Sequence, residues 1–128
     1  MRKTVLALAG LAMMASSAWV QAASLSEDMD SINLNYRQAQ QATTAQDFKQ
    51  ALTAMRSAAE AAKSETPPKL QGQAADSAEM KDYRHGLDIL IGQIDKAEKL
   101  ADAGQLDQAK SEAQQMLQTR NTYHKKYR

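Results

Sequence analysis

The stretch Ser64-Glu65-Thr66-Pro67-Pro68-Lys69-Leu70 divides this 128-residue chain into two halves. Two consecutive prolines remove backbone donors and force the preceding residue out of the α region, so a helix cannot run through them. We therefore predict the longest connection of the fold from Ser64 to Asp76. On both sides of it, residues that favour helix dominate, while glycine and β-branched residues are scarce. The chain is predicted to be all-α.

The half before the prolines carries two amphipathic stripes, each with apolar residues three or four positions apart. The first predicted helix ends near Ala42-Thr43-Thr44. Thr44 is placed to cap the second helix, with Asp47 in its first turn, and this helix runs to about Lys63. The two stripes consist of Leu25, Met29, Ile32, Tyr36 and Ala39, and of Phe48, Leu52, Met55, Ala59 and Ala62.

The half after the prolines carries two further stripes. Ser77 is a candidate cap for the third helix, Gly104 is a candidate C-terminal glycine, and the fourth helix follows almost at once. Four helices with two short links and one long link predict an antiparallel up-down-up-down bundle. Arg120 interrupts the last stripe, and its place on this inward face predicts a buried side chain that needs an anion as partner. The stripes consist of Met80, Tyr83, Leu87, Leu90, Ile94, Ala97 and Ala101, and of Leu106, Ala109, Ala113, Met116, Tyr123 and Tyr127.

Residues 1–22 have the form of a secretory signal peptide, with two early cations, an apolar stretch from Val5 to Ala15 and a small residue at Ala22. The apolar stretch is shorter than the ~20 residues that a membrane-spanning helix needs. We expect cleavage after Ala22, so that residues 23–128 form one exported domain that starts at Ala23. We expect no membrane insertion after cleavage.

Composition excludes several classes of function. Loss of Arg2 and Lys3 with the signal peptide takes Lys+Arg from 16 to 14 against 15 Asp+Glu, a formal charge of −1, which argues against nucleic-acid binding. The chain has no cysteine, which excludes disulfides, thiolate metal sites, iron–sulfur clusters and covalent haem attachment. No catalytic arrangement of a nucleophile with a base stands out, and we do not predict an enzyme.

Met29 and His124 are the candidate metal ligands. Met29 follows Leu25 by four residues and His124 precedes Arg128 by four, about 6 Å from each helix end at 1.5 Å per residue. In an antiparallel bundle they therefore lie at one depth, and a thioether facing an imidazole suits six-coordinate haem iron in electron transfer. Arg120, one turn before His124, is a candidate partner for a haem propionate. Spacing alone leaves open a core-filling methionine and a surface histidine.

Four long segments carry a family resemblance. They are residues 66–70, 79–86, 88–95 and 119–128, with the sequences TPPKL, EMKDYRHG, DILIGQID and TRNTYHKKYR. These segments resemble the soluble cytochrome b562 family, and the resemblance extends over the whole mature chain without a visible gap. It implies a periplasmic electron carrier with one noncovalent b-type haem and an unidentified redox partner protein, and it implies that Met29 and His124 are the axial ligands.

Two positions depart from the family pattern, in which two phenylalanines of helix three line the haem. Tyr83 and Leu87 stand there in this chain, and we expect both to line the haem, although the Tyr83 hydroxyl needs a partner if it is buried. We interpret His85 as a surface residue. The mature protein is expected to be a monomer. The alternative hypothesis is a haem-free periplasmic bundle that binds partner proteins or buffers metal.

Overall fold

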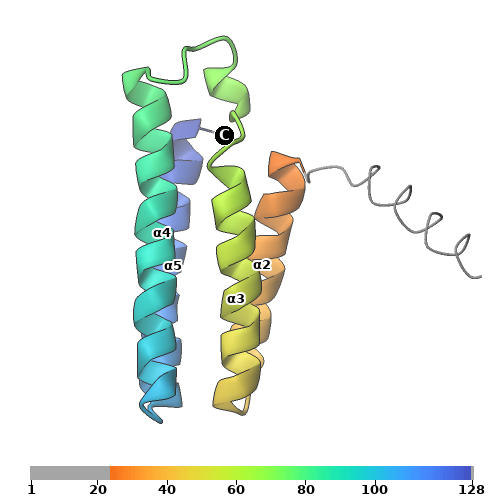
Figure 1. Ribbon diagram of the computed structural model, residues 1–128, viewed down its shortest axis with the longest axis vertical. Helices are drawn as coiled ribbons and strands as arrows, with labels where there is room; N and C mark the ends of the chain where they lie inside the picture. Colours follow the sequence, from red (N-terminus) through yellow and green to blue (C-terminus); the bar gives the residue numbers. More distant parts are fainter. Residues whose placement is uncertain (1–23, 128) are drawn as a thin grey trace, which may run out of the picture.

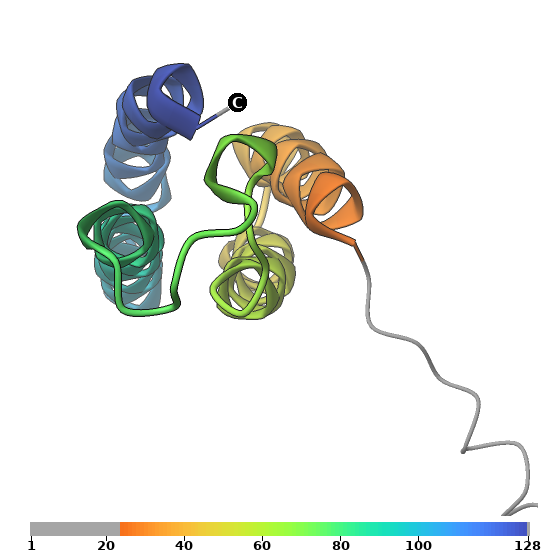
Figure 2. The same ribbon diagram turned by 90° about the horizontal axis from the view of Figure 1, so that it is seen from above.

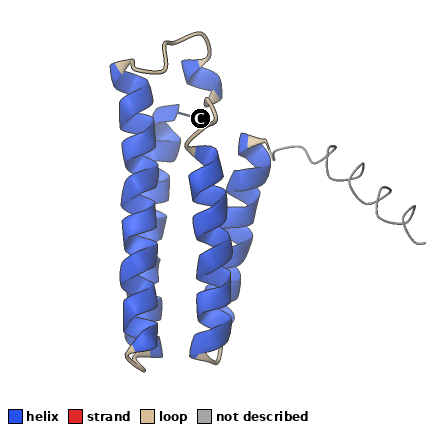
Figure 3. Cartoon of the chain, viewed as in Figure 1, coloured by secondary structure: helices blue, strands red, loops and turns tan. Residues whose placement is uncertain are grey.

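The computed structural model describes residues 24–127, and all their regular secondary structure is helical (Figure 3). The predicted signal peptide, its cleavage after Ala22 and the first mature residue Ala23 lie outside the described residues. The predicted all-α bundle is confirmed. The elements are α2 Leu25–Gln41, α3 Ala45–Ala62, the 3₁₀ helix η3 Pro68–Leu70, α4 Ala78–Asp102 and α5 Leu106–Tyr127.

Helices α2, α3 and α4 begin at side-chain caps. The predicted caps Thr44 and Ser77 are confirmed, because their hydroxyls accept hydrogen bonds from the backbone N–H groups three residues ahead, at 3.1 and 3.2 Å. α2 begins with a capping box that we did not predict. Ser24 Oγ accepts from the Glu27 N–H at 3.2 Å, and Glu27 Oε1 accepts from the Ser24 N–H at 3.0 Å.

Gly104 ends α4 as predicted. Its φ of +80° lies in the left-handed region that glycine adopts without a steric cost. The Gln105 N–H donates to the Leu100 carbonyl at 2.9 Å and the Gly104 N–H to the Ala101 carbonyl at 3.0 Å, which together form a Schellman motif. The chain therefore reverses within a few residues, and α5 packs back along α4.

The bundle consists of two helical hairpins, α2 with α3 and α4 with α5. Figures 1 and 2 show the four helices side by side, with the α3–α4 connection at the end where α2 begins and α5 ends. The hairpins pack together mainly through α3 and α4, while α2 and α5 make few contacts with each other. The side of the bundle between α2 and α5 is therefore its most loosely packed seam.

Ion pairs line the α3–α4 seam between the two hairpins. The paired positions recur every seven residues on each helix and run in opposite directions, as antiparallel packing requires. Each exposed pair contributes only about 0–1 kcal/mol, so the apolar core contributes most of the stability of this seam. The pairs are Lys49 with Asp102, Arg56 with Asp95 and Glu98, and Lys63 with Asp88.

The connection after the prolines closes one end of the bundle. Pro67 and Leu70 are buried, and η3 contacts α5. Figure 2, which views this end, shows the connection between the start of α2 and the end of α5. The prolines therefore end α3 and also let the chain fold over the end that holds the predicted ligands.

Candidate functional site

A hydrogen bond between α2 and α5 defines how the two candidate ligands lie. Arg120 Nη1 of α5 donates to Asn33 Oδ1 of α2 at 2.9 Å. His124 lies one turn after Arg120, and Met29 lies one turn before Asn33. Residues four apart share a helix face, and the helices are antiparallel. Met29 and His124 therefore lie at one level on the facing sides of α2 and α5.

The candidate ligands differ in exposure. Met29 is partly buried and packs against the core, whereas His124 is exposed. Arg120 is also exposed, so the inference from its position on an apolar stripe that it is buried is wrong. α2 and α5 make few contacts with each other, and Arg120 and His124 of α5 are both exposed.

Tyr83 joins three helices at this end. It is 6% exposed, and its hydroxyl donates to the Ala62 carbonyl at the end of α3 at 2.7 Å, which supplies the partner that burial demands. Burial, together with the nearby Glu65 and Asp28 carboxylates, raises the pKa of Tyr83 to about 12. The hydroxyl therefore stays protonated at neutral pH.

Leu87 and an aromatic group form one wall of this end of the bundle. Leu87 is buried one turn after Tyr83. The Tyr83 and Tyr127 rings meet edge to face with centroids 6.0 Å apart, and the Tyr127 and Tyr123 rings stack at 6.4 Å. Lys126 Nζ lies 4.8 Å from the Tyr123 ring centroid. The ends of α4 and α5 that carry the predicted site are thus packed by aromatic side chains.

Two carboxylates at this end have contrasting environments. Asp28 is 4% exposed, its Oδ2 has no hydrogen-bond partner among the described residues, and burial raises its pKa. Asp82 accepts hydrogen bonds from the Tyr127 hydroxyl and from Lys126 Nζ, and the Tyr127 bond is the main cause of its lowered pKa. Asp82 therefore ties the end of α5 to α4, while Asp28 is a buried carboxyl group one residue before Met29 in the chain.

Gly86 lets α5 approach α4 closely. A Cβ atom at this position would lie 2.6 to 2.7 Å from three ring carbons of Tyr123. One of these is Cγ, which is attached to the Tyr123 Cβ and cannot swing away freely. Contact between these helices therefore requires a residue without a side chain at position 86.

Replacing Gly86 with alanine is expected to destabilise the haem-free fold by up to about 2 kcal/mol, because an overpacking cost of about 1–3 kcal/mol exceeds the gain of about 1 kcal/mol in helix propensity. Gly92→Ala is the matched control, since nothing lies within 4 Å of a Cβ there. The control should be neutral or stabilising. Urea unfolding of both variants tests this, and equal stabilisation of both would contradict the close contact.

Other features of the described residues add no second site. His85 is exposed, as predicted, and no cluster of three or more histidine or carboxylate groups suited to a metal occurs in residues 24–127.

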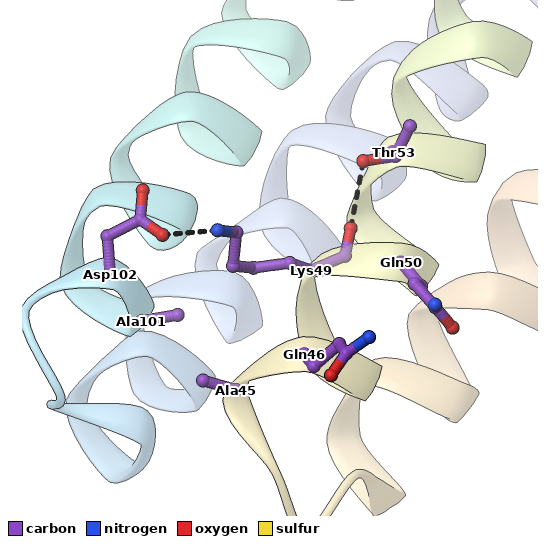
Figure 4. A pocket seen from close by; sticks show the side chains of 7 residues that line it. All are labelled: Ala45, Gln46, Lys49, Gln50, Thr53, Ala101 and Asp102. Carbon is purple, nitrogen blue, oxygen red and sulfur yellow. Dashed lines mark hydrogen bonds and ion pairs between the residues drawn. The ribbon is translucent and has the colours of Figure 1, made fainter.

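Within the same range, no helix has the length and apolar character needed to cross a membrane. A surface hollow of about 560 Å³ lies at the opposite end of the bundle, where Lys49 pairs with Asp102 (Figure 4).

The donors at the α2–α5 seam fit a haem. A thioether and an imidazole occur at one level on facing helices, beside a buried wall that holds Tyr83 and Leu87, and an exposed arginine lies one turn away. A family model for cytochrome b562 matches residues 24–128. The chain belongs to the cytochrome b562 family. As a member of that family it is a haem-binding electron-transfer cytochrome.

Two relatives of cytochrome b562 type come from Yersinia pestis. "Probable soluble cytochrome b562 2" is 50% identical to this chain over 128 residues, which is 100% of both chains. "Probable soluble cytochrome b562 1" is 43% identical over 107 residues, which is 84% of each chain. The family resemblance predicted from the sequence is thus confirmed.

Sequence reasoning missed several residues of the site. It assigned no role to Asn33, Asn121 or Asp28, and it did not recognise the need for glycine at position 86. One signal was available for Asn33, because it lies one turn inside Met29 just as Arg120 lies one turn inside His124. Pairing the two helices residue by residue would have placed Asn33 opposite Arg120.

Proposed function

We propose that Met29 and His124 are the axial ligands of one noncovalent b-type haem and that the protein carries electrons in the periplasm. The hydrogen bond between Arg120 and Asn33 is the observation that supports this most, since its register sets the thioether and the imidazole at one level. When bound, the haem supplies one-electron chemistry between ferric and ferrous iron.

The remaining site residues shield and orient the group in this proposal. Tyr83 and Leu87 give an apolar wall that excludes water, and the bond from Tyr83 to the Ala62 carbonyl holds that wall in place. With a protein ligand on each side of the iron, no coordination position is left for a substrate. The protein therefore transfers electrons to and from an unidentified partner protein and is not an enzyme.

Export and assembly belong to the same proposal. Residues 1–22 direct the chain to the periplasm and are removed after Ala22, and the mature protein is a monomer. Mass spectrometry of the exported protein tests the cleavage site, and a mass that includes residues 1–22 would contradict it. Gel filtration with light scattering tests the oligomeric state.

The visible spectrum of protein purified from the periplasmic fraction tests the function. A six-coordinate, low-spin haem gives sharp α and β bands on reduction, and we expect them at one haem per chain. Pyridine treatment gives the type and amount of haem. Folded, exported protein that lacks these bands and does not take up added haemin would instead favour a haem-free bundle that binds partners or metal.

Arg120 is proposed to bind a haem propionate. Its exposure suits a group that faces solvent, and its bonds to Asn33 and Asn121 use three of the five guanidinium N–H groups. Arg120→Leu should weaken haem binding about tenfold and should change the reduction potential, because a charge-assisted hydrogen bond is lost. Haemin titration and redox titration measure both effects, with Arg37→Leu as an exposed control on α2. Unchanged affinity and potential would contradict the assignment.

A further inference from the structure

The Arg120 guanidinium is oriented before it reaches α2. Arg120 Nε and Nη2 both donate to Asn121 Oδ1, at 3.3 and 3.0 Å, and Nη1 donates across the seam to Asn33 Oδ1 at 2.9 Å. The planar guanidinium is thus held on two sides by amide oxygens. We call the three residues Asn33, Arg120 and Asn121 the clasp.

The clasp acts on the side of α2 that faces α5, where α2 has few other contacts. α2 packs along α3 but makes few contacts with α5. A second hydrogen bond between α2 and α5, from Gln40 Nε2 to the Lys110 carbonyl at 3.0 Å, lies farther from the site. Burial raises the pKa of Tyr36, and the positive charge of Arg120 partly offsets this increase. The guanidinium therefore lies against α2, where it is bound to Asn33.

We propose that Asn33 is a positioning residue for Met29, which it holds in axial register through the clasp; this rests on the proposed function. A thioether is a weak ligand, so its contact with iron depends on how firmly the protein holds the helix that carries it. Met29 lies one turn from Asn33 on the same face. Loss of the clasp therefore lets α2 move away from α5 and releases the sulfur more often.

The first test measures how easily an added ligand replaces Met29. Imidazole binds ferric haem only when the thioether leaves, so its apparent affinity reports the fraction of open sites. Asn33→Ala should tighten imidazole binding about three- to tenfold, which corresponds to the loss of one net hydrogen bond. Asn33→Asp keeps an acceptor for Arg120 and should restore the wild-type value.

Asn35→Ala is the matched control, because Asn35 Nδ2 donates to the Ser31 carbonyl of its own helix at 2.8 Å. It should leave imidazole binding unchanged. Equal imidazole affinity of Asn33→Ala and wild type, or an equal effect of Asn35→Ala, would overturn the proposal. Met29→Leu separates this inference from the proposed function: if Met29→Leu does not tighten imidazole binding, Met29 is not the ligand and the proposed function fails instead.

A second test uses the haem-free protein. Asn33→Ala should speed amide hydrogen exchange in α2 about three- to tenfold relative to α4, because the clasp no longer holds α2. Adding Arg120→Leu to this variant should cause no further increase, since both changes remove the same bond. Additive effects of the two changes, or unchanged exchange in α2, would show that the clasp does not restrain the helix.

Discussion

Replacing His124 with alanine is expected to lower haem affinity at least about 100-fold in both oxidation states. Imidazole nitrogen is a good donor to ferric and to ferrous iron, so removal of the imidazole lowers haem affinity in both states. Changes to residues that only orient a metal ligand already cost 10–100-fold in metal affinity, and loss of the ligand itself should cost more. Haemin titration of the ferric and the reduced protein measures the affinity of each state.

The haem-free fold of the same variant should be nearly unchanged, because His124 is exposed and the core lies elsewhere. His85→Ala is the control, since His85 is the other histidine of the chain and is exposed on α4. It should retain wild-type affinity. Retention of tight haem binding by His124→Ala would refute the ligand assignment, whereas a loss of helical content would show that the change acts through folding.

Replacing Met29 with leucine is expected to lower the reduction potential by about 60 mV or more. The volume of the side chain is nearly kept, so the effect reports the sulfur. A thioether prefers the more electron-rich ferrous ion, which is why ligation by methionine and histidine raises the potential. Each tenfold difference in affinity between the two states corresponds to about 59 mV for a one-electron couple. Redox titration measures the shift, with the spin state read from the same spectra.

Met116→Leu provides the matched control for the sulfur. Met116 lies on α5, is 2% exposed and belongs to the packed core. Its replacement should leave a low-spin spectrum and the wild-type potential. If Met29→Leu kept both its spectrum and its potential, the sixth ligand would have to be another residue.

The sequence by itself determined where α3 and α4 begin and where α4 ends. Thr44 and Ser77 cap the helices that follow them, and Gly104 closes α4 with a positive φ, as their residue types indicated. Each signal acts on backbone groups within about five residues, so its outcome does not depend on the rest of the fold. The break at the prolines is likewise a local backbone effect. The common level of Met29 and His124 in the bundle was predicted from their distances to the helix ends.

Only the tertiary structure decided which side chains meet between helices. The sequence indicated a buried Arg120, but the guanidinium is exposed and bound to Asn33, 87 positions away in the chain. The close contact of Gly86 with the Tyr123 ring likewise depends on how α4 packs on α5. An apolar stripe tells which face of a helix turns inward, but not how closely two helices approach or whether their seam is filled. Distance and rotation between helices follow from the packing of all four at once, because each contact joins residues that are far apart in the chain.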